Sequence, residues 1–226
     1  MTGDWQLRRD MVDIGRRLHD KGLVAASDGN LSARTDAGHL LITGSGTYLG
    51  ELTPDQIVRV TTDGRLVAGS RKPSSEMPLH LAVYRTRPDV QAVVHAHPPI
   101  TTAFSFAGVS IAQCVIPEVV LTLGTIPTAP YATPGSDEGP FAIAGLIGDH
   151  DAIILERHGS VTVGKSLKDA YYKLEKVEHA AQVLFHARQL GKVIPLSREE
   201  LRKIADVRQR LGLGPTEDVW RHCGGP

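Results

Sequence analysis

The sequence of 226 residues predicts one domain of the α/β class. Three observations lead to this prediction. An amphipathic helical pattern opens the chain, short apolar runs typical of buried strands recur in its middle, and a long helical pattern follows them. Strands and helices that alternate in this way are typical of a sheet covered by helices. There is no internal repeat and no low-complexity linker, so the single domain is expected to span residues 1–226.

The first part of the chain is predicted to form a helix, a turn-rich segment and a strand. Residues 4–21 carry apolar side chains at helical spacing, and Gly22 is a natural stop. Residues 26–34 (ASDGNLSAR) are rich in turn-forming residues. Residues 39–43 (HLLIT) are a strand candidate, and the loop GSGTYLG follows it.

A hairpin and a second helix are predicted next. Residues 57–67 (IVRVTTDGRLV) resemble a hairpin with an Asp-Gly turn. Residues 76–87 suit a helix, for which Ser74 or Ser75 could be the cap. Pro78 is compatible with this helix only in its first turn.

Two buried strands and two helices are predicted in the second half. The apolar runs 90–97 (VQAVVHAH) and 152–159 (AIILERHG) both read as strands, and each stops at proline or glycine. Helical spacing from residue 166 to 189 predicts a long helix closed by Gly191. A last helix is predicted to begin at Ser197, in a Ser-Arg-Glu-Glu capping box, and to end near residue 212.

Composition excludes several classes of protein. Lys and Arg number 25, as do Asp and Glu, so no overall positive charge attracts nucleic acid or a membrane surface. No segment approaches the roughly 20 apolar residues of a membrane span, and the first residues do not read as a signal peptide. We therefore expect a cytoplasmic protein. Cys114 and Cys223 are too few for a disulfide framework, and nothing in their spacing pairs them.

Three histidines predict a metal site. His95 and His97 are two residues apart in a predicted strand, so their side chains project from the same face. His158 also ends a predicted apolar strand and precedes a turn residue. Three neutral imidazoles would fill three positions of a tetrahedral zinc site and leave one for substrate. The other histidines are expected to pack or to face solvent; they are His19, His39, His80, His150, His179, His186 and His222.

Small polar residues predict an anion site. Ser74, Ser75 and Glu76 precede a helix whose free N–H groups could bind a phosphate, although a plain helix cap is the simpler interpretation. The loops that contain Asn30 and Ser45 add neutral donors. The sequence lacks the phosphate-binding loop and the dinucleotide fingerprint, and it lacks the nucleophile elbow of common serine hydrolases.

Taken in order, six motifs resemble the class II aldolase/adducin family, which includes L-fuculose-1-phosphate aldolase and L-ribulose-5-phosphate 4-epimerase. They are Asp28-Gly29-Asn30-Leu31-Ser32, Ile42-Thr43-Gly44-Ser45-Gly46, Pro73-Ser74-Ser75-Glu76, Val94-His95-Ala96-His97, Ala129-Pro130-Tyr131-Ala132-Thr133-Pro134-Gly135 and Arg157-His158-Gly159. The resemblance implies a three-layer α/β/α fold with a mostly antiparallel sheet, and a C4 homotetramer with sites between subunits.

The resemblance also implies a role for each matching residue. His95, His97 and His158 match the ligands of a divalent metal, zinc or manganese, and Glu76 matches the acid/base glutamate of the aldolases. Five residues match the positions that hold the substrate phosphate: Asn30, Ser45, Gly46, Ser74 and Ser75. The chemistry implied is a metal-dependent lyase that cleaves a short ketose 1-phosphate to dihydroxyacetone phosphate and an aldehyde.

One stretch departs from the aldolase pattern. In fuculose-phosphate aldolase a tyrosine of the neighbouring subunit serves as a proton donor near the C4 oxygen, whereas residues 110–118 contain no tyrosine and Ile116 occupies the matching position. Glu118 lies near the position at which related dehydratases carry an acid/base glutamate, so it is a second catalytic candidate. A pentulose-phosphate epimerase, a methylthioribulose-phosphate-type dehydratase, a sugar-acid phosphate decarboxylase and a non-catalytic adducin-like scaffold remain alternatives. The retained histidines and Glu76 argue against the scaffold.

Overall fold

A computed structural model describes residues 3–213, 220 and 223. Within these residues, eight strands form one sheet in the order β4-β3-β2-β1-β5-β8-β7-β6. Only β6 and β7 pair in parallel, and the other neighbours are antiparallel. The strands are β1 (Asn30–Arg34), β2 (Leu40–Thr43), β3 (Ile57–Val60), β4 (Leu66–Ala68), β5 (Ala92–Ala96), β6 (Thr128–Ala129), β7 (Ala152–Leu155) and β8 (Gly159–Gly164).

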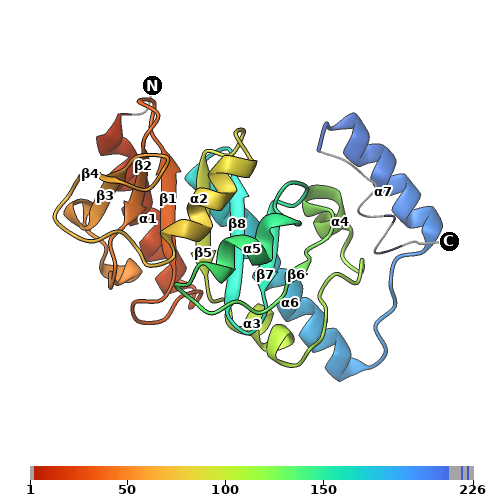
Figure 1. The fold of residues 1–226 in the computed structure, drawn as a ribbon. Helices are drawn as coiled ribbons and strands as arrows, with labels where there is room; N and C mark the ends of the chain where they lie inside the picture. The colour runs from red at the N-terminus through yellow and green to blue at the C-terminus, as the bar shows by residue number, and fades with distance from the viewer. Residues whose placement is uncertain (1–2, 214–219, 221–222, 224–226) are drawn as a thin grey trace.

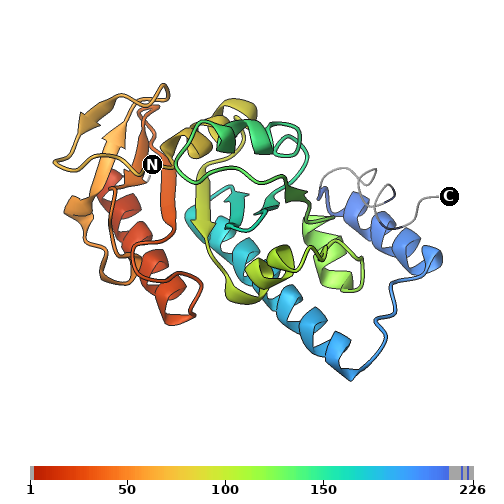
Figure 2. The same ribbon diagram turned by 60° about the horizontal axis from the view of Figure 1, so that its bottom comes forward.

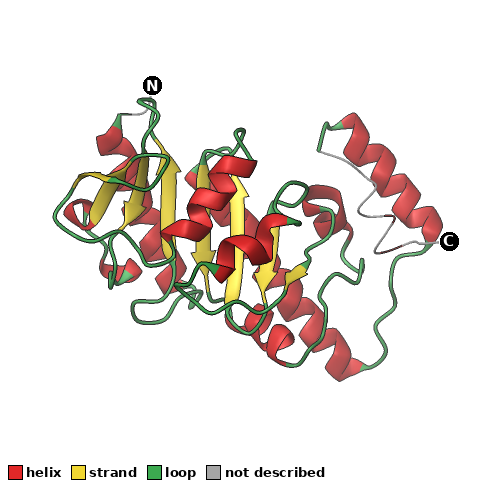
Figure 3. Cartoon of the chain, in the orientation of Figure 1, coloured by secondary structure: helices red, strands yellow, loops and turns green. Residues whose placement is uncertain are grey.

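Helices cover both faces of this sheet, as Figures 1 and 3 show. Helices α1, α3 and α6 lie on one face and α2 and α5 on the other, while α4 and α7 pack together at one end (Figure 2). The three-layer, mostly antiparallel architecture implied by the family resemblance is confirmed. The helices are α1 (Asp4–Asp20), α2 (Met77–Thr86), α3 (Pro99–Phe106), α4 (Pro117–Leu123), α5 (Glu138–Ala144), α6 (Leu167–Leu190) and α7 (Arg198–Arg210).

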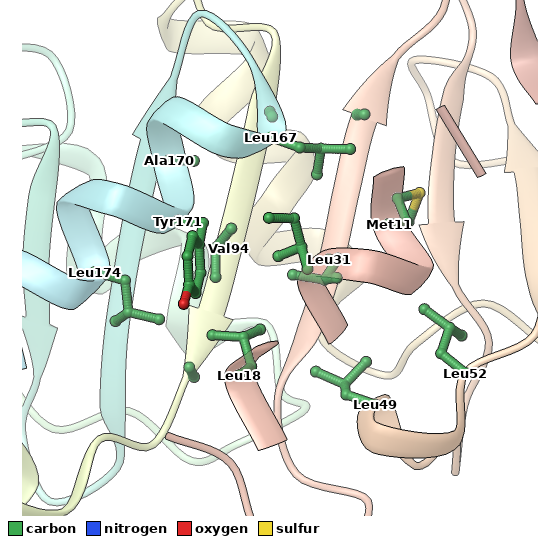
Figure 4. Packing of buried hydrophobic residues seen from close by; sticks show 14 of the residues in the cluster. Met11, Leu18, Leu31, Leu49, Leu52, Val94, Leu167, Ala170, Tyr171 and Leu174 are labelled. Atoms are coloured by element: carbon green, nitrogen blue, oxygen red, sulfur yellow. The ribbon is translucent and has the colours of Figure 1, made fainter. Parts of the chain in front are cut away.

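Alternation along the central strands builds the core between the layers. In β5, Val94 packs with α1 and α6, whereas Val93 packs beneath α2 on the opposite face. Figure 4 shows the first of these clusters, in which Leu31 and Val94 meet Leu18 of α1 and Tyr171 of α6. The polar residues of β1 and β5 that face α2 are therefore enclosed between a sheet and a helix.

Most of the predicted long elements are confirmed. The helix expected over 4–21 and the long helix closed by Gly191 are present, and Ser197 begins α7 with the expected capping box. Strands β2, β5 and β7 lie inside the predicted runs. The hairpin turn near Gly64 also forms, with the Gly64 N–H bound to the Thr61 carbonyl.

Three expectations from the sequence were wrong. Residues 30–34 form the buried central strand β1, not turns, because β2 and β5 pair with them on both sides. The N-cap of α2 is Glu76, and neither Ser74 nor Ser75 caps it. The predicted strand 152–159 is not one strand, because β7 ends at Leu155 and Gly159 begins β8. Cys114 and Cys223, which no spacing pattern pairs, are joined by a disulfide with Cα atoms 5.6 Å apart. Within the described residues, no helix is both long and apolar enough to cross a membrane.

Candidate metal and phosphate site

Two strand ends bring the three predicted histidines together. His95 lies in β5 and His97 just beyond it, so both side chains leave the same face of the sheet. His158 lies in the turn between β7 and β8, and β8 is the next neighbour of β5. The ring centroids of the three histidines are 4.8–4.9 Å apart.

The donor set fits a divalent metal ion. One ring nitrogen from each histidine lies within 4.8 Å of the other two, and the Nε2 atoms of His95 and His97 are 3.1 Å apart. In a tetrahedral zinc site the nitrogen ligands are about 3.3 Å apart, as zinc–nitrogen bonds of about 2.0–2.1 Å require. The Nδ1 of His95 is 3.0 Å from the Ser160 carbonyl oxygen and would donate to it, so that Nε2 remains as the ligand atom.

Glu76 lies directly against these imidazoles. Its carboxylate oxygens are 3.0 Å from Nε2 of His95 and 3.4 Å from Nε2 of His158, and the side-chain amide of Asn30 donates to it at 2.8 Å. Burial alone would raise the pKa of Glu76, but the charge of a protonated His95, with the hydrogen bonds that it and Asn30 then donate, outweighs burial and lowers the pKa well below its usual value. Glu76 is therefore ionised at neutral pH.

The surroundings of His97 and His158 favour their neutral form. Burial is the main cause that lowers the pKa of His97 to about 3 and that of His158 to about 4, and repulsion from His95 adds to it. A neutral imidazole is the form that binds a metal. At neutral pH, these two side chains therefore need to release no proton before they coordinate an ion.

A cleft of about 210 Å³ joins the metal candidates to the predicted phosphate residues. It is lined by the five residues that match phosphate positions and by Glu76, His97 and His158; the five are Asn30, Ser45, Gly46, Ser74 and Ser75. His95 is fully buried and contacts two lining residues, Glu76 and His97. The fold thus brings the predicted phosphate residues, Glu76 and the predicted metal ligands to one place.

Backbone pairing holds the phosphate candidates beside the start of α2. The Ser45 N–H donates to the Lys72 carbonyl, and the Ser74 N–H donates to the Thr43 carbonyl. These bonds fix the loop after β2 against the segment that leads into α2. The cleft therefore combines hydroxyl groups with the positive end of a helix, which is an arrangement suited to an anion.

Glu118 is not brought to this cleft. It lies exposed in the first turn of α4, among residues that do not line the cleft. Its catalytic role stays a prediction. The sequence analysis in turn missed His80, which it treated as a packing residue and which hydrogen-bonds to Asn30 beside the site. The signal for His80 was its place one helical turn after Glu76.

Comparison with known proteins identifies the family of this chain. The model of the Class II Aldolase and Adducin N-terminal domain matches residues 9–185. The chain belongs to this family. It is 37% identical over 183 residues to the 3-oxo-tetronate 4-phosphate decarboxylase of Escherichia coli K12, an alignment that covers 79% of this chain and 86% of that protein.

Two further relatives extend the comparison. The L-fuculose phosphate aldolase of Methanocaldococcus jannaschii is 36% identical over 176 residues, covering 78% of this chain and 94% of the aldolase. The crystal structure of YgbL from Klebsiella pneumoniae superposes with a TM-score of 0.82 and 37% identity, covering 90% of this chain and 99% of YgbL. The chain is thus an enzyme of the class II aldolase superfamily, which includes both aldolases and decarboxylases among these relatives.

Proposed function

We propose that this enzyme is a metal-dependent lyase that decarboxylates a four-carbon 3-oxo sugar acid carrying a 4-phosphate. The main support is a cleft that holds a phosphate cradle, an ionised carboxylate and three histidines, but offers no tyrosine from residues 110–118 to a leaving group. The identity of 37% to 3-oxo-tetronate 4-phosphate decarboxylases supports the same choice. From the sequence, an aldolase was the first choice and a sugar-acid phosphate decarboxylase was one of the alternatives. The decarboxylase is now preferred.

The two reactions share most of their chemistry. Decarboxylation breaks the C1–C2 bond of the acid, releases CO₂ and leaves an enediolate that takes one proton to give dihydroxyacetone phosphate. Aldol cleavage of a ketose 1-phosphate breaks C3–C4, releases an aldehyde and leaves the same enediolate. The phosphate, the enediolate and the proton delivered to carbon therefore require the same parts of the site in both enzymes.

The leaving group distinguishes the two reactions. An aldol leaving group must exchange a proton at the C4 oxygen, which in fuculose-phosphate aldolase is the task of the tyrosine. A carboxylate leaves as CO₂ and exchanges no proton. Because Ile116 occupies the tyrosine position, this chain has kept the parts needed for the enediolate and not the group needed for the aldehyde.

Each part of the cleft then has a role. Ser45, Ser74 and Ser75, with the N-terminus of α2, bind the phosphate. Glu76 would deliver the proton to the carbon from which CO₂ departs, which requires that bound substrate raises its otherwise lowered pKa. His95, His97 and His158 would hold the zinc or manganese ion, which as a Lewis acid would stabilise the enediolate.

An aldolase is the second candidate, supported by the identity of 36% to fuculose phosphate aldolase. In either case the family resemblance implies a homotetramer with sites between subunits. Glu118 is exposed on α4, so within that assembly it would act on the site of a neighbouring subunit. Light scattering that finds a fully active monomer would remove this part of the proposal.

A product assay tests the proposal directly. The zinc-loaded enzyme is given freshly prepared 3-oxo-tetronate 4-phosphate or a panel of ketose 1-phosphates, and CO₂ and dihydroxyacetone phosphate are both measured. We expect equal amounts of the two products from the acid, and little dihydroxyacetone phosphate from the ketoses. The His97→Ala variant controls for spontaneous loss of CO₂. Release of dihydroxyacetone phosphate from a ketose 1-phosphate, with no enzyme-dependent CO₂ from the acid, would establish the aldolase instead.

A further inference from the structure

A row of polar side chains runs inward from Glu76 between α2 and the sheet. Glu76, His80 and Tyr84 are spaced four residues apart, so they occupy one face of α2. Asn30 and Ser32 are two residues apart on β1 and share the face that looks towards this helix. His80 and Ser32 are fully buried, and Asn30 and Tyr84 are only 4% exposed.

Hydrogen bonds join all five residues in sequence. Nδ2 of Asn30 lies 2.8 Å from Oε2 of Glu76, and Oδ1 of Asn30 lies 2.5 Å from Nε2 of His80. Nδ1 of His80 is 2.6 Å from the Ser32 hydroxyl. That hydroxyl is in turn 2.8 Å from the Tyr84 hydroxyl. The chain of contacts thus extends from the cleft to the interior without a gap.

The direction of every hydrogen bond in this row follows from the Glu76 carboxylate at one end, which can only accept. An ionised Glu76 can only accept, so the Asn30 amide nitrogen donates to it and the Asn30 oxygen is left to accept. His80 must then donate from Nε2, and a neutral ring accepts at Nδ1 from the Ser32 hydroxyl. Ser32 has then used its proton, so it accepts from Tyr84. No bond in the row can be reversed alone.

This order determines what Asn30 presents to the cleft. If its amide were turned over, the Asn30 oxygen would face the Glu76 carboxylate and its N–H groups would face the Nε2–H of His80. Both contacts would be repulsive. Because Asn30 lines the cleft, a bound anion meets a donor there and not an acceptor.

We propose that His80 is a positioning residue for this site. Through its Nε2–H it holds Asn30 with the amide nitrogen towards Glu76 and the cleft, and Ser32 and Tyr84 hold His80 in that tautomer. The inference deepens the proposed function, on which it rests only for its activity readout. The tautomer itself is a property of the folded protein and can be measured without a substrate.

Two variants of similar polarity separate positioning from general packing. His80→Gln can place its amide nitrogen near the position of Nε2 and keep a donor to Asn30. His80→Asn reaches only the position of Nδ1 and leaves the Asn30 oxygen without its donor. We expect kcat of the Asn variant to fall by about 10–100-fold, as for other residues that orient a site, while the Gln variant keeps most of its activity. Equal losses in both variants, at matched melting temperatures, would overturn the proposal.

The second measurement does not depend on the proposed reaction. Histidine labelled with ¹⁵N reports which ring nitrogen carries the proton, and the His80 signals are assigned as those absent from the His80→Gln spectrum. We expect the proton on Nε2 in the wild-type protein, and a loss of this preference in Ser32→Ala. A proton on Nδ1 of His80 in the wild type would refute the proposal whatever the enzyme catalyses. An Nε2 proton in an enzyme that proves inactive on the acid would leave this inference standing and remove only the proposed reaction.

Discussion

Replacing Gly159 with alanine is expected to weaken metal binding, although residue 159 has no side chain and is not a ligand. Gly159 begins β8 beside the end of β5. A Cβ added there would lie 2.4 Å from the Ala96 carbonyl oxygen and 2.7 Å from Cδ2 of His97. The backbone of Gly159 is not in the left-handed region, so the objection to alanine is steric. One of the two clashing groups is the His97 ring itself.

The size of the effect follows from these contacts. Real Cβ atoms essentially never approach another heavy atom closer than 3.0 Å, so the 2.4 Å contact must open by at least 0.6 Å, the difference between the two. Binding sites tolerate misplacement of roughly 0.5 Å. We therefore expect zinc affinity to fall by about 10–100-fold, as when an orienting partner is lost, and stability to fall by about 1–3 kcal/mol, as for an overpacked core.

The assay compares Gly159→Ala with a matched control. Gly145 has an ordinary φ of −81° and nothing within 4 Å of an added Cβ, so Gly145→Ala should leave both properties unchanged. Zinc affinity is measured by competition with a chelator, at a temperature where denaturation curves show all three proteins folded. Wild-type zinc affinity in folded Gly159→Ala would refute the reasoning, because His97 would then not depend on close contact with β8.

Four further outcomes are expected. His97→Ala should lose most of its metal in elemental analysis, at least about tenfold; full retention would contradict the three-histidine site. Ser75→Ala should raise KM for phosphorylated substrate, since a hydrogen bond to a charged group is worth about 1.5–3 kcal/mol, while unphosphorylated analogues should be unaffected. Glu76→Gln should cut kcat by about 10²–10⁴-fold with metal still bound, and Glu118→Gln should cost clearly less; the reverse order would indicate dehydration or another proton-transfer chemistry. Burial lowers the pKa of His80 from 6.5 to about 3, so the unfolded chain binds more protons between these values, and the metal-free protein should lose stability as pH falls from 6.5 towards 3. Urea unfolding at a series of pH values checks this, and His80→Gln should flatten the dependence.

The sequence predicted the metal candidates because their spacing carries geometric information. In a strand, a separation of two residues places His95 and His97 on one face, whatever the rest of the fold does. The strand end predicted at His158 was wrong, because β7 already ends at Leu155 and Gly159 begins β8. What spacing could not supply was the pairing of β5 with β8, which brings His158 to the pair. His158 was grouped with the pair only because it also lay at a predicted strand end, and the family resemblance supported that grouping.

The failures have a common physical cause. Strand β1 was taken for turns because Asn30 and Ser32 are polar, yet they are buried, since α2 supplies hydrogen-bond partners for both. His80 was assigned to packing for the same reason. Apolar periodicity detects residues that are buried by the hydrophobic effect, and it cannot detect residues that are buried by each other's hydrogen bonds. The polar side chains closest to the site were therefore the ones that sequence patterns placed least well.

The separation of Glu118 from the cleft bears on how one fold serves several reactions. The residues proposed to bind phosphate, Glu76 and the three histidines lie within one chain. In the proposed function they would serve the enediolate that decarboxylation and aldol cleavage have in common. Residues 110–118 hold the groups that would distinguish the leaving groups, and Glu118 among them lies exposed on α4. If those groups act across a subunit boundary, as the family resemblance implies, substitutions there can change the leaving group without disturbing the buried row from Tyr84 to Glu76. Substitutions in residues 110–118 would then leave the residues that stabilise the enediolate unchanged. This is a physical reason why one scaffold can support both bond cleavages.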